Sequence, residues 1–229
     1  RGFADYSPAE LQQVKAAYYA MVTLIDDEVG RILDVLERQG LAEDTIVIFT
    51  SDHGELLGDH QLMLKGPMQY DCSVRVPLLI RHPGRIPAGT VIDDLVQWID
   101  LTATFLDAAG TELPGVQGRS LLPRVTGAST EPVRDWAICE YRDSGHPYDP
   151  AVHTTMLRHD RYKLVVHHGD PATARQRQGE LYDLVADPAE LVNLYDDPAH
   201  AATRLRLVEL LLDIGVATED RRQPRDDFW

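Results

Sequence analysis

The spacing of apolar residues predicts a long amphipathic helix near the start of the chain. Ser7, Pro8 and Glu10 form a capping box, in which Ser7 caps a helix whose first position is the proline. Apolar residues then recur every three or four positions as far as Leu36, which places them on one face of a helix. Gly40 supplies the glycine that commonly ends a helix. We therefore expect one long helix between this cap and this glycine.

Two short apolar segments after the helix have the character of buried strands. Residues 45–50 are β-branched or apolar throughout, and residues 76–81 form a similar run that ends in an arginine. A continuous apolar run of this length is typical of a strand covered on both faces, as in a parallel sheet. Residues 95–109 add a further helix. The alternation of helices and buried strands predicts an α/β region.

The pattern changes character after residue 125. Short segments of strand-forming residues are now separated by turn residues, which is typical of an antiparallel sheet. They are residues 136–141, 154–158, 162–167 and 180–184, and a final amphipathic helix is expected at residues 198–214. We therefore predict an α/β domain over residues 1–125 and a smaller antiparallel α+β subdomain over residues 126–229.

The net charge of the chain narrows the classes of partner. At -15, the chain is a poor partner for nucleic acid or for an anionic membrane surface. It remains compatible with an anionic substrate, because a bound metal and a few cations can reverse the potential in one cleft. No segment approaches the ~18 apolar residues of a membrane-spanning helix, and the first residues lack the apolar stretch of a secretory signal. We expect a soluble protein, either cytoplasmic or periplasmic.

The chain has two cysteines, Cys72 and Cys139, which are too few for a disulfide framework. Neither lies in a CxxC pair, so a zinc knuckle and a dithiol redox motif are excluded. With 229 residues, of which 44% are hydrophobic, the chain can bury a sizeable core without such cross-links.

Candidate metal ligands follow the first predicted strand. Asp52 and His53 come directly after residues 45–50, and ligands of open α/β sheets lie beyond the carboxyl ends of the strands. A carboxylate oxygen suits Ca²⁺ or Mg²⁺, while an imidazole also accepts transition metals. Gly54 permits a tight departure of the backbone. The alternative interpretation is that Asp52 caps the loop and His53 lies in solvent, since short motifs recur by chance.

Two further side chains of this loop have candidate roles. The ammonium group of Lys65 could bind an anionic oxygen near the metal and offset charge that develops in a transition state. A solvated lysine is the alternative. His60 could contact the substrate or the metal ligands, or it could be a structural or exposed histidine.

These residues belong to a series of motifs that resembles a known family. In chain order the motifs are Ser51-Asp52-His53-Gly54-Glu55, Gly58-Asp59-His60, Lys65-Gly66, Tyr70, Arg75-Val76-Pro77-Leu78, Ile99-Asp100-Leu101, Gly118-Arg119-Ser120-Leu121, Arg161-Tyr162-Lys163-Leu164, Glu180-Leu181-Tyr182-Asp183-Leu184, Asp187-Pro188, Glu190 and Asn193-Leu194. The series resembles the C-terminal half of the sulfatase catalytic domain, in the alkaline-phosphatase-like superfamily. The resemblance implies part of an alkaline-phosphatase-like sandwich with a mostly parallel sheet, followed by the antiparallel lobe.

The resemblance also implies a reaction and roles at matching positions. Asp52 and His53 match a late metal-ligand pair that usually binds Ca²⁺, with Mg²⁺ or Mn²⁺ as alternatives. Lys65 matches the lysine that contacts the sulfate group and helps to stabilise the leaving oxygen. The family's nucleophile is a formylglycine made from Cys or Ser in a C/S-x-P-x-R motif. The implied activity is hydrolysis of a small-molecule sulfate ester.

The sequence departs from the family pattern at the nucleophile. The residues that follow Cys72 and Cys139 lack the proline and the spacing of the nucleophile motif. The family's early metal ligands, which normally precede this region, are not found either. We therefore expect a chain that supplies half of a site and binds metal weakly by itself. We also expect it to associate, either as a homo-oligomer or with a missing N-terminal segment.

Two other functions remain alternatives, and one group of residues has two candidate roles. A phosphonate monoester or phosphodiester hydrolase is similar in the same loop. A non-catalytic fragment or binding module is the alternative that is not an enzyme. The C-terminal half is rich in side chains that could line a substrate pocket or lie on the sheet surface. They are His146, Tyr148, His153, His167 and His168.

Overall fold

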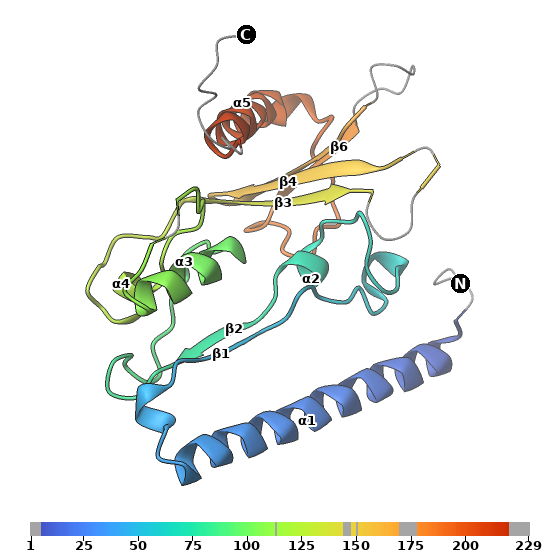
Figure 1. Cartoon of the computed structure of the whole chain (residues 1–229). Coiled ribbons are helices and arrows are strands. Elements are labelled where there is room, and N and C mark those ends of the chain that lie inside the picture. The colour runs from blue at the N-terminus through green and yellow to red at the C-terminus, as the bar shows by residue number, and fades with distance from the viewer. Residues whose placement is uncertain (1–5, 113, 144–147, 150, 170–177, 220–229) are drawn as a thin grey trace. The chain divides into compact units, whose positions relative to one another are not determined.

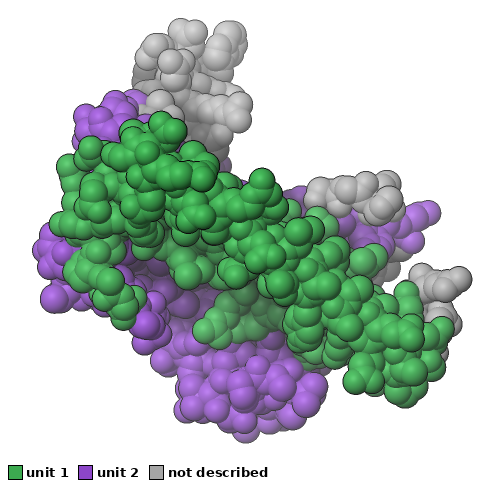
Figure 2. Space-filling model, turned by 90° about the horizontal axis from the view of Figure 1, so that it is seen from below, with its two compact units in different colours: residues 1–90 green, residues 91–229 purple. Residues whose placement is uncertain are grey.

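The chain folds into two compact units in a computed structural model that describes residues 6–112, 114–143, 148–149, 151–169 and 178–219. Unit 1 consists of residues 1–90 and unit 2 of residues 91–229, as coloured in Figure 2. These units divide at residue 90. The sequence-based domain boundary at residue 125 concerns the family's domain organisation and stays a prediction.

Unit 1 begins with the predicted helix α1 (Pro8–Arg38), which a short 3-10 turn η2 (Ala42–Asp44) follows. Its capping box is confirmed, because Ser7 Oγ accepts a hydrogen bond from the Glu10 N–H while the Glu10 carboxylate accepts one from the Ser7 N–H at 2.8 Å. None of the α1 residues is buried. Although α1 is the longest described helix, neither it nor any other helix in the described ranges is long and apolar enough to cross a membrane.

The strands of unit 1 differ from the expectation in their direction. β1 (Val47–Thr50) and β2 (Leu78–Arg81) pair antiparallel, with Phe49 opposite Leu79, whereas a parallel sheet was expected from their apolar character. The expected burial on both faces is also wrong for this chain, since no residue of β1 or β2 is buried and Phe49 and Leu79 are 37% and 59% exposed. An apolar run does not encode strand direction, and an otherwise parallel sheet can carry an antiparallel strand. The short elements η3 (Asp59–Gln61) and α2 (Asp71–Val74) lie in the connection between the two strands.

Unit 2 contains the predicted antiparallel lobe. Its sheet has the strand order β3-β4-β5-β6, and every neighbouring pair is antiparallel. The strands are β3 (Trp136–Arg142), β4 (His153–His159), β5 (Tyr162–His167) and β6 (Gln178–Asp183). The helices are α3 (Ile99–Ala108), α4 (Leu122–Val125) and α5 (Ala201–Ala217), with the 3-10 turn η4 (Pro198–His200) before α5. The mixed α/β class with an antiparallel C-terminal lobe is therefore confirmed.

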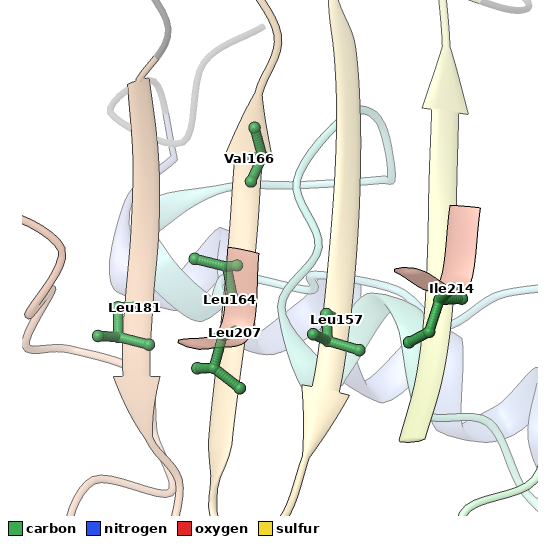
Figure 3. Packing of buried hydrophobic residues seen from close by; sticks show 6 residues of the cluster. All are labelled: Leu157, Leu164, Val166, Leu181, Leu207 and Ile214. Carbon is green, nitrogen blue, oxygen red and sulfur yellow. The ribbon is translucent and has the colours of Figure 1, made fainter. Parts of the chain in front are cut away.

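The core of unit 2 lies between its sheet and α5, which runs across one face of the strands (Figure 1). Four strand side chains meet two from the helix, and none is more than 4% exposed. Figure 3 shows them as sticks: Leu157, Leu164, Val166, Leu181, Leu207 and Ile214. Burial of one such side chain contributes roughly 1.5–3 kcal/mol, so this layer stabilises the lobe without any cross-link.

A buried ion pair joins α3 to the segment before β3. The guanidinium of Arg134 contacts both carboxylate oxygens of Asp100 at 2.5 Å, and the two side chains are 1% and 0% exposed. The same carboxylate accepts hydrogen bonds from the backbone N–H groups of Gln97 and Arg119, at 2.7 and 2.8 Å. Asp100 thus connects three segments, and both of its carboxylate oxygens accept hydrogen bonds.

The charged residues of two motifs in the C-terminal lobe form further ion pairs. Lys163 on β5 lies 2.6 Å from Glu190, and both side chains are almost fully buried. Arg161, in the preceding turn, contacts Asp183 at the end of β6 at 2.6 Å. These residues belong to the motifs on which the family resemblance rests. Their ion pairs connect parts of unit 2 to one another.

Replacement of Asp100 by alanine tests the buried pair. We expect Asp100→Ala to lower the free energy of unfolding by about 3–5 kcal/mol, because it leaves the Arg134 charge buried and unpaired. Glu28→Ala is the matched control, since Glu28 pairs with Arg31 in solvent at 2.8 Å, and its loss should stay below about 1 kcal/mol. Urea denaturation measures both variants. Equal losses for the two variants would show that the buried pair has no special weight.

Candidate functional site

The loop after β1 presents Asp52 at its start. Ser51 Oγ donates to the His53 carbonyl oxygen at 2.8 Å, which turns the backbone directly after the strand. The His53 N–H in turn donates to Asp52 Oδ1 at 2.9 Å. The Asp52 side chain is nevertheless 72% exposed. One carboxylate oxygen is thus held by the backbone, and the other faces outward.

The geometry of His53 leaves one ring nitrogen available. Its Nδ1 lies 2.7 Å from the Gly54 carbonyl oxygen. Since a carbonyl can only accept, Nδ1 is the donor in this contact, and Nε2 is the ring nitrogen that a neutral imidazole would offer to a metal. Nε2 lies 3.4 Å from Asp52 Oδ2. A second hydrogen bond of this kind commonly orients a histidine that ligates a metal.

The pair fits one side of a metal site. Two ligands bound to the same cation at roughly 2.0–2.6 Å lie about 3 Å apart when they are adjacent in its shell, and Asp52 Oδ2 and His53 Nε2 have this spacing. Over the described part of the chain, no group of three or more His, Cys, Asp or Glu side chains is placed to hold a metal. The pair is therefore a partial ligand set, and its role as metal ligands stays a prediction.

Lys65 lies within electrostatic reach of this pair. The His53 N–H, through its hydrogen bond, lowers the pKa of Asp52 below its ordinary value, and the positive charge of Lys65 acts in the same direction. Asp52 is therefore ionised at neutral pH, as a metal-binding carboxylate must be. The Lys65 side chain itself is exposed. The loop thus brings the three predicted side chains into one neighbourhood, while the sulfate contact of Lys65 stays a prediction.

Gly54 is required by a close approach between two backbone segments. Its N–H donates to the Ser73 carbonyl oxygen at 2.7 Å. A Cβ atom at this position would lie 1.9 Å from the Cys72 carbonyl oxygen, a distance that no side chain can adopt. The loop is thus held against α2, and this contact is a stronger reason for glycine than the tight turn that the sequence suggested.

The segment between Gly54 and Lys65 has an unusual backbone. Of the seven described non-glycine residues with positive φ, four lie here: Leu57, His60, Gln61 and Leu64. This left-handed conformation costs about 1–2 kcal/mol for each such residue. Glu55 Oε1 accepts hydrogen bonds from the Leu57 and Leu64 N–H groups at 3.2 and 2.5 Å. No role was expected for Glu55 from the sequence, because these contacts have no periodic signature.

His60 has a packing partner in the structure. Its ring stacks on that of Tyr70, with 3.6 Å between the ring centroids and an angle of 5° between the planes. This contact is the structural alternative that the sequence left open for His60. A substrate contact of His60 stays a prediction.

The aromatic and imidazole groups of the C-terminal lobe mostly contact its own strands. His167 Nε2 lies 2.7 Å from Glu180, His168 Nε2 lies 2.8 Å from Thr155 Oγ1, and Tyr148 packs edge-on against Tyr141. His153 lies at the start of β4 with a buried Nδ1 that has no hydrogen-bond partner among the described residues. His146 lies outside the described residues. Their lining of a substrate pocket stays a prediction.

Among the described residues neither cysteine forms a disulfide, and both are only partly exposed. Burial raises the pKa of the Cys139 thiol, which disfavours the reactive thiolate. Cys72 lies on α2, whose backbone packs against Gly54. These surroundings are those of packed thiols and give no support to either as a nucleophile.

Comparisons with known proteins match the chain along most of its length. Residues 58–216 match the family model described as N-sulphoglucosamine sulphohydrolase, C-terminal, and residues 1–111 match the sulfatase family model. An N-acetylglucosamine-6-O-sulfatase of Bacteroides thetaiotaomicron is 35% identical over 206 residues, which are 87% of this chain and 35% of that protein. The chain therefore spans about a third of the length of this curated relative.

Solved structures show the same relationship in three dimensions. An enzyme solved in complex with its substrate D-glucosamine-2-N,6-O-disulfate has a TM-score of 0.81 and 30% identity, over 95% of this chain and 43% of that one. The phosphonate monoester hydrolase of Agrobacterium radiobacter has a TM-score of 0.83 and 33% identity, over 95% of this chain and 44% of that one. With family models that together span most of its residues, the chain belongs to the sulfatase family.

Proposed function

We propose that the protein hydrolyses sulfate esters, with Asp52 and His53 as ligands of a divalent cation and Lys65 as a contact of the sulfate group. The observation that carries the proposal is the clustering of these three side chains on one loop of a sulfatase-family chain. The lone pair of His53 Nε2, the ionised Asp52 and the nearby Lys65 charge are chemically suited to a bound cation and a bound anion. The substrate class is a small-molecule sulfate ester.

Lys65 would act on the oxygens of the ester. As the bond between sulfur and the leaving oxygen breaks, negative charge grows on that oxygen, and a fixed ammonium group lowers the energy of this state. The Lys65 side chain is exposed in the chain, so its three N–H donors are open to an anion. Lys65 would thus bind the sulfate group and stabilise the leaving oxygen.

Asp52 and His53 would hold a divalent cation, with Ca²⁺ as our first choice and Mg²⁺ or Mn²⁺ as alternatives. When bound, such a cation polarises the sulfate oxygens as a Lewis acid. The two side chains fill only part of the six to eight positions around Ca²⁺. The formylglycine expected for the family has no C/S-x-P-x-R motif in this sequence. We therefore assign to this chain the late ligands and the sulfate-contacting lysine, without the nucleophile.

A second candidate is hydrolysis of phosphonate monoesters or phosphodiesters. It is favoured by the structural similarity to the Agrobacterium radiobacter phosphonate monoester hydrolase, whose identity to this chain is 33%, against 30% for the enzyme solved with D-glucosamine-2-N,6-O-disulfate. Sulfate and phosphonate esters are both tetrahedral anions, so Asp52, His53 and Lys65 could serve either reaction.

Removal of the lysine charge tests the role of Lys65. In the protein at its natural length, we expect Lys65→Ala to lower kcat/KM for an aryl sulfate by about 10²–10³-fold, as for the loss of one donor to a developing negative charge. Lys15→Ala on α1 is the control, because it removes the same charge from a position outside the loop. Steady-state kinetics measure both. A similar rate for Lys65→Ala and Lys15→Ala would exclude the sulfate contact.

A comparison of two substrates separates the candidate reactions. We expect kcat/KM of the protein at its natural length to be higher for an aryl sulfate than for a phenyl phosphonate of the same leaving group. The reverse order would favour the phosphonate hydrolase. Hydrolysis of neither ester would favour a non-catalytic module.

Calcium titration tests the partial ligand set. The 229-residue chain should bind Ca²⁺ only weakly in calorimetry, because two ligands leave most of the coordination shell to water. Asp52→Asn should remove the remaining heat, while Asp44→Asn, in the turn η2, should leave it unchanged. Micromolar affinity of the wild-type chain would contradict the assignment of only two ligands.

A further inference from the structure

A closed loop separates Asp52 and His53, here called the metal pair, from Lys65. Residues 56–64, here called the 56–64 loop, begin and end at the same place: the Leu56 N–H donates to the Leu64 carbonyl oxygen at 3.0 Å. Leu56 is fully buried and anchors this base. Lys65 follows Leu64 directly. The contacts that fix the backbone of Leu64 therefore also fix the backbone position of Lys65.

The side chain that holds Leu64 is the carboxylate of Glu55. Its Oε1 accepts the Leu64 N–H at 2.5 Å and the Leu57 N–H at 3.2 Å, so a single oxygen contacts both ends of the loop. Glu55 follows His53 by two residues, and it thereby connects the end that carries the metal pair to the end that carries Lys65.

The backbone of the 56–64 loop needs such a restraint. Leu57 and Leu64, the two residues that Glu55 holds, have φ values of 45° and 66°, a region that bulky L-residues rarely adopt. Strained conformations of this kind persist only where the surroundings hold them in place. The stacking of His60 on Tyr70 is a second restraint at the tip of the loop. Without the carboxylate, the two N–H groups lose their acceptor and the base of the loop is free to relax.

We propose that Glu55 is a positioning residue, which places Lys65 by clamping the backbone of Leu57 and Leu64. It acts through hydrogen-bond geometry and not through its charge on metal or substrate. This inference rests on the proposed function of Lys65 for its effect on rate, but the clamp itself does not.

Three substitutions of Glu55 separate the effect of its side-chain length from the effect of its charge. Glu55→Gln keeps an oxygen acceptor at the same distance and removes the charge. Glu55→Asp keeps the charge but shortens the side chain by one methylene, so that it no longer spans both N–H groups. Glu55→Ala removes both. A positioning role predicts that Gln preserves the clamp better than Asp, whereas a role of the charge predicts the opposite order.

Hydrogen exchange measures the clamp without any assay of activity. In the protein at its natural length, we expect exchange of the Leu57 and Leu64 amides to be at least about tenfold faster in Glu55→Ala and close to wild type in Glu55→Gln. Glu43→Ala, an exposed glutamate of unit 1, is the control and should change neither amide. Protection of the amides of the β1–β2 pair in unit 1, and of Leu157 and Leu164 in unit 2, reports that each variant is folded. Unchanged exchange of both loop amides in Glu55→Ala would overturn the proposal.

A double-mutant cycle tests whether Glu55 acts through Lys65. We expect Glu55→Ala to lower kcat/KM for an aryl sulfate by about 10–100-fold, mostly in kcat, and Glu55→Gln to restore most of the loss. In a Lys65→Ala background the same substitution should cost less than about twofold. Independent, multiplying losses would overturn the link to Lys65. Fast exchange in Glu55→Ala together with a wild-type protein that hydrolyses no ester would leave the clamp in place and reject the proposed function alone.

Discussion

The contact between Gly54 and the backbone of α2 is the constraint on which the site depends. The Gly54 N–H reaches the Ser73 carbonyl oxygen, and the Cys72 carbonyl oxygen occupies the space where a side chain would begin. The chain leaves β1 with Asp52 and His53 just before this contact and continues with Glu55 just after it. Asp52, His53 and the clamp of the 56–64 loop therefore belong to a single short stretch, whose place against α2 is set by one glycine.

The site combines groups that are held with groups that are open. His53 Nδ1 and Asp52 Oδ1 are engaged by the backbone, which leaves Nε2 and Oδ2 side by side and free to bind a cation. Lys65 is exposed, yet its position follows from Leu64, which Glu55 holds. Preorganisation of this kind matters for catalysis, because a charge that is already in place does not have to move when the transition state forms.

Sequence patterns predicted the elements better than their contacts. The cap of α1 and the antiparallel lobe could be expected because both rest on residues close in sequence. Strand direction could not be, since the apolar run of β1 does not encode how its partner strand runs, and the burial that the run suggested for both faces of β1 is not found. The pair of Asp100 with Arg134 joins residues 34 positions apart, and only the fold brings them together.

The candidate site shows the same division. Asp52, His53 and Lys65 were predicted from their place after a strand and from the family resemblance. The role of Glu55 was missed, because a carboxylate that accepts a backbone N–H group nine residues away leaves no trace in hydrophobic periodicity. The positive φ of Leu57 and Leu64 was also unexpected, as leucine is a residue that normally avoids this conformation.

In the proposed site, one loop of this chain holds a cation and a sulfate group side by side. A crystal structure of the protein at its natural length, grown with Ca²⁺ and inorganic sulfate, would show both ions. We expect a cation bound by Asp52 Oδ2, at about 2.3–2.6 Å, and by His53 Nε2. We also expect the Lys65 ammonium within hydrogen-bond distance of a sulfate oxygen. A cation bound away from Asp52 and His53, or a sulfate that Lys65 does not reach, would contradict the proposed site.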